Sequence, residues 1–444
     1  MSGFNRSDND EFARGARALI VYPELPGRAS VGPDARLEEA KRLALAIGLN
    51  VVRTKHYRVR KPRAVTLLGG GQVDEIAEMG RELEIDLLIV DAGLTAIQQR
   101  NLEDKTGLKT IDRTGLILEI FGERAATAEG RLQVELAHLD YQAGRLVRSW
   151  THLERQRGGF GFLGGPGETQ IEADRRMIRD RMARLRRELE EVKRTRSLHR
   201  ARRKRAPWPI IALVGYTNAG KSTLFNRLTK ASVLAEDMLF ATLDPTMRQI
   251  SLPGIEKAIL SDTVGFVSDL PTQLVAAFRA TLEEVISADI VVHVRDISHT
   301  ESDAQRDDVL GILSDLGIGS REDAEHRPEM IELWNKADLL DGEQRDLLGN
   351  AAARSEDVLL ISAETGEGVD AFKRLLSNRI AKGNESRSVT LKADDGAALA
   401  WLHGRGKIAR QTEQGDELLV EASLSRQLWG QFEKQFPAYE DAQA

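Results

Sequence analysis

The sequence predicts an α/β protein of three units: an N-terminal α/β domain with an antiparallel helical hairpin, a Ras-like P-loop domain, and a small α+β C-terminal domain. The length of 444 residues fits about three domains at ~150 residues each. Apolar runs of strand length alternate with segments of helical spacing, which is typical of a parallel sheet covered by helices. One such run, Ile210–Val214, precedes the pattern GxxxxGKS at Gly215–Ser222 and a helical segment. Strand, loop and helix in this order predict a P-loop domain.

The composition predicts a cytoplasmic protein without a membrane span. No apolar run approaches the ~18 residues that a span requires, and the polar stretch Met1–Arg14 lacks the apolar centre of a signal peptide. There is no cysteine, which excludes disulfides and thiolate metal sites. The net charge of −6 conceals a basic block, since residues 175–205 hold 15 Lys or Arg against 4 Asp or Glu. A basic block on an acidic body is typical of a protein that binds a polyanion with one face.

We expect a flexible N-terminus at residues 1–16, followed by an α/β domain at 17–125. The segment Gly69–Gly71 stands before a predicted helix and could seat an anion. It lacks both GKS/T and GxGxxG, so a tight turn is the favoured interpretation. The apolar patterns predict strands at 18–22, 51–57 and 86–90, and helices at 36–47, 73–83 and 95–102.

A helical hairpin is predicted at 126–206, because apolar residues there follow a seven-residue repeat in two stretches separated by a loop. The joining segment has six glycines within residues 158–167. A loop of that composition is costly to order, so it is either a mobile connector or a tip that binds nucleic acid; the second is favoured because Phe stacks on bases and Arg contacts phosphate. The apolar residues are Leu132, Leu136, Leu139, Ala143 and Leu146, then Ile171, Ile178, Met182, Leu185, Leu189 and Val192. The candidate RNA-binding residues are Arg155, Arg157, Phe160, Phe162, Arg175 and Arg176.

The P-loop domain is expected at 207–381, followed by a polar linker at 381–386 and a C-terminal domain at 388–444. Strands are predicted there at 388–392 and 417–421, and helices at 397–403 and 425–436. This last domain carries no residue pattern that indicates chemistry.

The phosphate loop predicts how a nucleotide triphosphate is held. Successive backbone N–H groups and the helix N-terminus face the anion, Lys221 neutralises phosphate charge, and the hydroxyl of Ser222 is a Mg²⁺ ligand. Asp262 and Gly265 form a DxxG at the end of a second strand, where the carboxylate holds Mg²⁺ through water and the Gly265 N–H senses the γ-phosphate. The expected nucleotide-binding residues of these two motifs are Gly215, Tyr216, Thr217, Asn218, Ala219, Gly220, Lys221, Ser222 and Thr223, with Asp262, Thr263, Val264 and Gly265.

Two further motifs indicate that the base is guanine. In the NKxD formed by Asn335, Lys336 and Asp338, the Asp carboxylate accepts hydrogen bonds from guanine N1–H and the 2-amino group. Adenine offers neither donor, and its binding would leave the carboxylate unpaired at a cost of ~1–3 kcal/mol. Ser362 and Ala363 close the set at the end of another strand. Four motifs in this order predict a GTPase domain.

A switch needs a hydroxyl that reaches Mg²⁺ and the γ-phosphate in the GTP state and then releases them. Thr242 is the first choice, with Thr246 as the alternative; Phe240 and Ala241 before it are expected to border the nucleotide. We expect the catalytic set to comprise Lys221, Thr242, Gly265 and Asn218, and the Mg²⁺ ligands to come from Ser222, Thr242 and Asp262.

Over nearly its whole length the sequence resembles the HflX family of ribosome-associated GTPases, in the translation-factor-related class that also contains Obg. The resemblance is carried by the segments 112–118 (DRTGLIL), 129–136 (EGRLQVEL), 165–170 (GPGETQ), 240–246 (FATLDPT), 262–266 (DTVGF), 270–271 (LP) and 274–278 (LVAAF). Gly164 departs from the family pattern, in which an Arg is expected before Gly165.

The resemblance implies binding to the large (50S) ribosomal subunit and its rRNA, and GTP hydrolysis stimulated by that subunit. It also implies that the protein splits stalled or idle ribosomes under stress. We expect the protein to be a monomer. The resemblance further implies that the hairpin tip approaches the peptidyl transferase centre. Phe266 follows the DxxG, where Ras-like enzymes have the Gln that orients water, so the chain is predicted to hydrolyse GTP slowly alone. Asn218 resembles the residue that binds K⁺ in other GTPases, or else it only stabilises the loop. The alternatives are a GTPase in tRNA modification or particle assembly, and an ATP- or GTP-dependent RNA remodeller.

Overall fold

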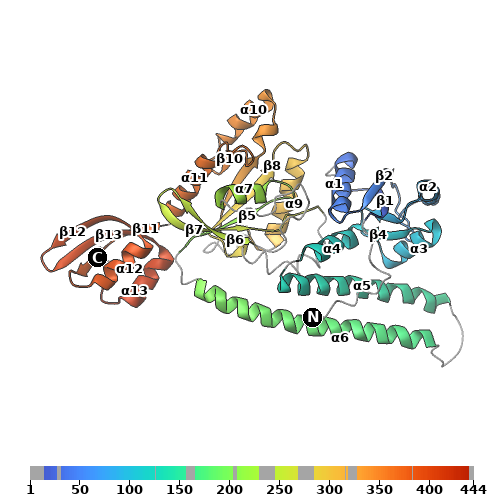
Figure 1. The fold of residues 1–444 in the computed structure, drawn as a ribbon, viewed down its shortest axis with the longest axis horizontal. Coiled ribbons are helices and arrows are strands. Elements are labelled where there is room, and N and C mark those ends of the chain that lie inside the picture. The colour runs from blue at the N-terminus through green and yellow to red at the C-terminus, as the bar shows by residue number, and fades with distance from the viewer. Residues whose placement is uncertain are drawn as a thin grey trace.

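The computed structural model describes residues 15–27, 32–125, 127–156, 166–203, 208–229, 246–268, 285–315, 317–318, 328–382 and 384–439. Three α/β bodies follow one another along the chain, and two long helices extend as an arm beneath the first two (Figure 1). Each body has its own sheet, of four, six and three strands. The predicted fold class is confirmed.

The N-terminal sheet is parallel, in the order β2-β1-β3-β4. Alternate residues of its central strands enter two separate cores. Ala18 and Ile20 pack with helices α1 and α4, whereas Leu19 and Val21 pack with α2 and α3 on the opposite face, as the two-residue period of a strand requires. The strands are β1 (Arg17–Glu24), β2 (Asn50–Arg58), β3 (Leu87–Val90) and β4 (Lys109–Asp112), and the helices are α1 (Pro33–Ala46), α2 (Gly70–Glu82), α3 (Ala96–Thr106) and α4 (Arg113–Arg124).

The sequence analysis did not assign β4 and α4. Strand β4 has only four residues and begins with a lysine, so its apolar signal is short. Helix α4 begins where Asp112 accepts a hydrogen bond from the backbone N–H of Gly115 at 2.8 Å, an N-cap that ends the strand and starts the helix. This junction lies at the carboxyl edge of the sheet, facing the second body.

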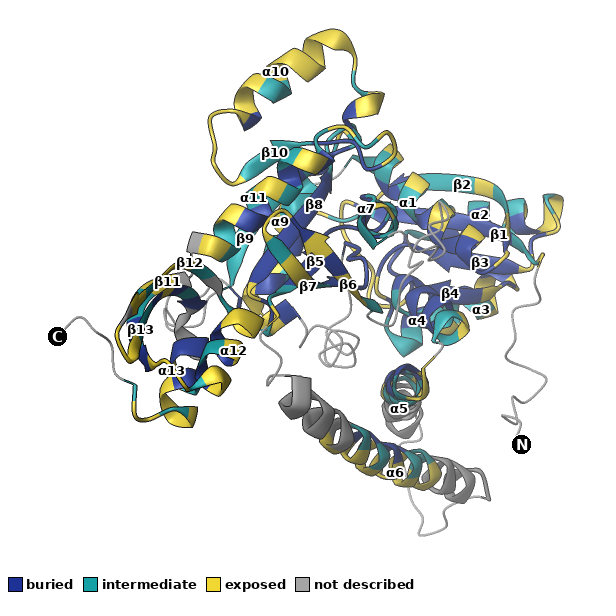
Figure 2. Ribbon diagram, turned by 60° about the vertical axis from the view of Figure 1, so that its left-hand side comes forward, coloured by how far each residue is buried: buried dark blue, intermediate teal, exposed yellow. Residues whose placement is uncertain are grey.

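The arm consists of α5 (Ala128–Gln156) and α6 (Pro166–Arg203), which lie side by side (Figure 1). The hairpin predicted from the seven-residue repeat is therefore present in the described helices. On α6, Met182, Leu185 and Leu189 are buried as expected. Among the α5 side chains that the structure describes, the most buried apolar ones are instead Val134 and Ala137, which join the core beneath α4. Figure 2 shows α5 between α4 and α6.

The second body is a six-stranded sheet in the order β10-β9-β8-β5-β7-β6, parallel except for the β6–β7 pair. Helix α9 covers the face that continues into the N-terminal core, and α7 and α11 cover the other face. The strands are β5 (Ile210–Val214), β6 (Thr246–Leu252), β7 (Ile255–Asp262), β8 (Ile290–Asp296), β9 (Glu329–Asn335) and β10 (Val358–Leu360), and the helices are α7 (Lys221–Thr229), α9 (Ser302–Asp315), η1 (Ala337–Leu339), α10 (Gly342–Ala352) and α11 (Val369–Lys382). The carboxyl ends of five parallel strands meet at one edge, where ligands bind in open α/β sheets.

The C-terminal body differs from the prediction at its start. Helix α11 continues to Lys382 and strand β11 begins at Asn384, so no linker separates them at 381–386. The polar residues of that stretch belong to a strand that pairs with β13 along its whole length and has one face toward solvent. Strand β12, which was not predicted, completes the sheet. The elements are β11 (Asn384–Lys392), α12 (Gly396–Arg405), β12 (Lys407–Gln414), β13 (Glu417–Ser425) and α13 (Arg426–Gln435).

Within the described ranges, no helix is long and apolar enough to cross a membrane.

Candidate guanine-nucleotide site

The phosphate loop joins the end of β5 to the start of α7. Lys221 is buried, and its Nζ donates hydrogen bonds to the carbonyl oxygens of Gly215 and Tyr216, at 3.1 and 2.8 Å. Burial away from water lowers the pKa of Lys221 to about 8, an effect that the nearby Asp262 carboxylate opposes. The ammonium is therefore held inside the loop, and a nearby polyanion would stabilise its charged form.

One glycine of the phosphate loop and one of the DxxG stand where only a small residue fits. Gly220 has φ +91°, and a Cβ there would come within 2.2 Å of Asn335 Nδ2. Gly265 of the DxxG lies against the loop, where a Cβ would be 2.8 Å from Thr217 Cγ2 and 3.1 Å from Lys221 Nζ. The glycines of both motifs thus let the phosphate loop contact its neighbouring strands closely.

Backbone hydrogen bonds join the DxxG segment to the phosphate loop. The N–H of Phe266 donates to Gly215 O at 3.1 Å, and the N–H of Thr217 donates to Phe266 O at 2.8 Å. Thr263 lies deeper, where its hydroxyl donates to Leu213 O at 2.6 Å, and Val264 is buried beside it. The side chain of Phe266 is 1% exposed and belongs to the core shared with the N-terminal domain. It is therefore packed inside the core between the two domains and is not exposed beside the phosphate loop.

Ser222 and Asp262 supply oxygen donors at a point where Mg²⁺ would lie. The Ser222 hydroxyl donates to Asp262 Oδ2 at 2.8 Å, and the Asp262 side chain is fully buried at the end of β7. Within the described residues no group of three His, Cys, Asp or Glu side chains could hold a metal. One hydroxyl and one carboxylate fit Mg²⁺ as it binds with nucleotide phosphates and water, which supply its other ligands.

The guanine motif is tied to the phosphate loop by Asn335. Its Nδ2 donates to Ala219 O and its Oδ1 accepts from the N–H of Ala363, both at 2.8 Å. Asp338 is exposed, and its Oδ1 accepts a hydrogen bond from Ser362 Oγ at 2.5 Å. The structure thus brings together the three strand ends that the sequence analysis connected by motif alone.

Lys336 stands beside Asp338, and its Nζ lies 2.7 Å from Asp296 Oδ2. The backbone of Lys336 is left-handed, with φ 66°. This turns the chain sharply between β9 and η1, so that the buried Asn335 and the exposed Asp338 face different neighbours.

Sequence reasoning missed the residues of the N-terminal domain that border the phosphate loop. Asn218, with φ 60°, lines a small pocket together with Thr217 and residues of α1, including Glu38 and Glu39. No motif in α1 identifies it as part of a nucleotide site, because its contact with the loop depends on how two domains pack.

Several predicted residues lie outside the described residues: Phe240, Ala241, Thr242, Arg157, Phe160 and Phe162. Arg155 belongs to α5, but its side chain is also outside what is described. The alternative switch residue, Thr246, begins β6. Arg175 is half-buried and Arg176 is exposed on α6, while Thr223 is half-buried at the start of α7.

Comparison with known proteins finds family models along most of the chain. They are "GTP-binding GTPase N-terminal" at residues 34–122, "GTP-binding GTPase Middle Region" at 124–203, "50S ribosome-binding GTPase" at 210–336 and "HflX C-terminal domain" at 347–443. The chain is 50% identical over 424 residues to "GTPase HflX" of Magnetococcus marinus, covering 94% of this chain and 96% of that protein. It is 38% identical to "GTPase HflX" of Escherichia coli strain K12, covering 97% and 99%. The chain belongs to the HflX family of GTPases.

As an HflX GTPase the protein is a GTP hydrolase, and its domain at 210–336 belongs to a family of 50S ribosome-binding GTPases. A solved structure described as "crystal structure of SsGBP and GDP complex" is also similar, with 23% identity and a TM-score of 0.47, covering 82% of this chain and 98% of that one.

Proposed function

We propose that this GTPase binds the large ribosomal subunit and couples GTP binding and hydrolysis to the splitting or rescue of stalled or idle 70S ribosomes. The observation that carries the proposal is the combination of a guanine-nucleotide site with a long basic arm on one chain. Helix α6 lies on the outer side of α5, beneath the first two bodies (Figure 1), and residues 175–205 hold 15 Lys or Arg against 4 Asp or Glu. A basic helix of this kind fits the phosphate backbone of RNA.

The roles we propose for the site residues follow from their positions. Lys221 leaves the loop carbonyls to neutralise the phosphates, and the Gly265 N–H contacts the γ-phosphate. When GTP binds, the Asp338 carboxylate gives up its hydrogen bond from Ser362 and accepts hydrogen bonds from guanine N1–H and the 2-amino group. Ser222 and Asp262 hold Mg²⁺, which when bound offsets negative charge on the phosphates.

Two further roles are proposed for Thr242 and Asn218. Thr242 is the proposed switch hydroxyl and third Mg²⁺ ligand. Asn218 is the proposed K⁺ ligand, since its position on the pocket beside the loop would allow a monovalent cation to lie next to the phosphates.

We also propose that hydrolysis is slow until the ribosome is bound. Phe266 occupies the position after the DxxG and is packed in the interdomain core, so this chain supplies no side chain there to orient water. The bound ribosomal subunit would order the switch segments. The arm would contact rRNA through Arg155, Arg157, Phe160, Phe162, Arg175 and Arg176, with the protein acting as a cytoplasmic monomer.

The test is sedimentation of the protein with purified 50S subunits in a non-hydrolysable GTP analogue and, separately, in GDP. We expect co-migration in the analogue and loss of it with Lys221→Ala. Lys257→Ala is the matched control, because it removes one positive charge at an exposed position outside the loop. No co-migration in either nucleotide would contradict the proposal and favour a tRNA or other RNA partner. Co-migration without dissociation of 70S ribosomes would favour a role in subunit assembly.

A further inference from the structure

Two consecutive residues, Asp112 and Arg113, lie between the arm and the nucleotide site. Both are buried, at 2% and 3% exposure, where β4 ends and α4 begins. They start the DRTG segment on which part of the family resemblance rests, and the nucleotide site as described gives them no role. Their side chains point to opposite partners, one to the arm and one to the second domain.

Asp112 holds the arm. Tyr141 of α5 donates its hydroxyl to Asp112 Oδ1 at 2.6 Å, and Arg145 Nη2 lies 2.9 Å from Asp112 Oδ2. The carboxylate also accepts from the backbone N–H groups of Gly115 and Leu94, at 2.8 and 2.9 Å. It is therefore fixed in the N-terminal domain while it anchors α5.

Gly115 makes this anchoring possible. A Cβ at that position would come within 2.8 Å of Tyr141 Oη and of Ile111 Cγ1. Because the glycine has no side chain, α5 can approach the start of α4 closely enough for the tyrosine to reach Asp112.

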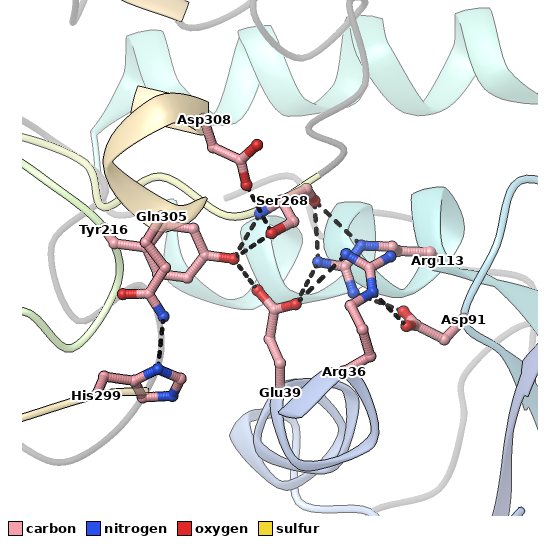
Figure 3. Close-up of polar contacts among 9 residues, drawn as sticks. All are labelled: Arg36, Glu39, Asp91, Arg113, Tyr216, Ser268, His299, Gln305 and Asp308. Carbon is pink, nitrogen blue, oxygen red and sulfur yellow. Dashed lines mark hydrogen bonds and ion pairs between the residues drawn. The ribbon is translucent and has the colours of Figure 1, made fainter. Parts of the chain in front are cut away.

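Arg113 holds the segment that follows the DxxG. Its Nε and Nη2 donate to the carbonyl oxygen of Ser268, at 3.2 and 2.9 Å (Figure 3). The guanidinium is fixed on its other side by Asp91 at 2.5 Å and by Glu39 at 2.9 Å. Glu39 in turn accepts a hydrogen bond from the hydroxyl of Tyr216, a phosphate-loop residue.

Ser268 is also bound to the phosphate loop. Its backbone N–H donates to Tyr216 Oη at 2.7 Å, and its hydroxyl donates to Asp308 of α9 at 2.8 Å. Ser268 stands three residues after Gly265, whose N–H is the proposed contact of the γ-phosphate. A shift of Gly265 toward a phosphate would therefore act on the bonds that Ser268 makes with Arg113.

We propose that the Asp112–Arg113 pair couples the orientation of the α5–α6 arm to the state of the nucleotide. The inference rests on the proposed function, in which the arm binds RNA and the N–H of Gly265 contacts the γ-phosphate. Binding of GTP changes the position of Ser268, Arg113 transmits the change to the junction of β4 and α4, and Asp112 transmits it to α5. Coupling free energies are reciprocal, so a partner that holds the arm changes nucleotide affinity by the same factor.

The arm's position can be measured without a ribosome, because the chain has no cysteine and two introduced cysteines are its only thiols. Spin labels at Met177→Cys on α6 and Leu347→Cys on α10 occupy side chains that are 62% and 70% exposed. We expect the distance distribution from double electron–electron resonance to differ between GDP and a non-hydrolysable GTP analogue.

Two variants test the pair itself. Arg113→Lys keeps a positive charge beside Asp91 and Glu39 but lacks the planar guanidinium that reaches Ser268 O with two donors. Tyr141→Phe removes one hydroxyl on the arm side. Arg113→Lys should abolish the nucleotide-dependent distance change. Tyr141→Phe leaves the contact between Arg145 and Asp112 and should therefore reduce the change. The control is Glu301→Ala, which removes the acceptor of another contact between the two domains, the 3.3 Å hydrogen bond from the N–H of Gly32, and should retain the change.

An unchanged distance in the two nucleotides, or a change of undiminished size in both variants, would overturn the inference. If Arg113→Lys does not fold, the result with Tyr141→Phe decides it. A second measurement separates this inference from the proposed function: 50S subunits should shift the affinity for the GTP analogue about five-fold or more, and less in Tyr141→Phe. If subunits do not bind but the distance still responds to nucleotide, the coupling stands and the ribosomal function fails.

Discussion

Substitution of Gly220 by alanine tests whether the phosphate loop and the guanine motif are one rigid unit. The Cβ of the alanine would lie 2.2 Å from Asn335 Nδ2, well inside the ~3.5 Å of ordinary contact. Asn335 would have to move, although its amide holds Ala219 O on one side and the N–H of Ala363 on the other. The substitution should therefore disturb both the phosphate contacts and the base contacts.

Two effects set how far Gly220→Ala lowers the free energy of unfolding. A left-handed backbone costs an alanine ~1–2 kcal/mol, and the loss of a buried hydrogen bond with its donor left unsatisfied costs a further ~1–3 kcal/mol. We expect Gly220→Ala to lower the free energy of unfolding by about 2–5 kcal/mol. The weakened link to Asn335 should also lower guanine-nucleotide affinity at least ~10-fold, which corresponds to ~1.4 kcal/mol.

Gly254→Ala is the matched control. Gly254 lies in the same domain with φ +77°, but no atom lies within 4 Å of the position that a Cβ would take. It should therefore show the backbone strain alone, with unchanged nucleotide affinity. Urea unfolding and titration with a fluorescent GDP derivative measure both quantities. Equal destabilisation of the two variants, with nucleotide affinity retained in both, would refute the reasoning.

Three other predictions concern Lys221, Ser222 and two arginines of the arm. Phosphate favours the charged form of Lys221, whose pKa is lowered to about 8 without nucleotide. GTP binding should therefore take up a proton above pH 8, and affinity should fall by up to ~10-fold per pH unit as pH rises through that value; a flat profile from pH 7 to 9.5 would contradict this. Ser222→Ala should raise the Mg²⁺ concentration for half-maximal hydrolysis, measured by magnesium titration, and an unchanged value would exclude the hydroxyl as a ligand. Changing Arg175 and Arg176 to Gln should reduce the log–log salt dependence of 50S binding by up to ~0.9 per lost phosphate contact, and an identical slope would place both residues away from RNA.

The nucleotide site was predictable because its motifs combine local signals. Glycines, a lysine and a carboxylate recur at the ends of strands that apolar runs already identify. The seven-residue repeat predicted the hairpin for the same reason. It did not predict that Val134 and Ala137, rather than the leucine stripe, are the most buried apolar side chains among those described on α5, because a repeat records spacing and not which neighbour covers each face.

Two strands that were not predicted from the sequence are short or polar, and the contacts between the domains depend on distant partners. Strand β4 has four residues, and all residues of β12 except Ile408 and Ala409 are charged or polar. The contact of α1 with the phosphate loop requires Glu39 and Tyr216, which are 177 residues apart, and no pattern within either segment indicates the other. The hydrogen bonds from Arg113 to Ser268 likewise join residues that are far apart in the sequence, 155 positions, so no local pattern predicts them.

Selection of guanine by one carboxylate is the claim on which the whole account depends. The most direct measurement is the relative affinity of Asp338→Asn for guanosine and xanthosine diphosphates. An amide at this position can donate to the 2-oxygen of xanthine but no longer accepts both guanine donors. We expect the preference to reverse in favour of the xanthosine nucleotide. Retained preference for guanosine would contradict the assignment of Asp338 and, with it, the proposed site.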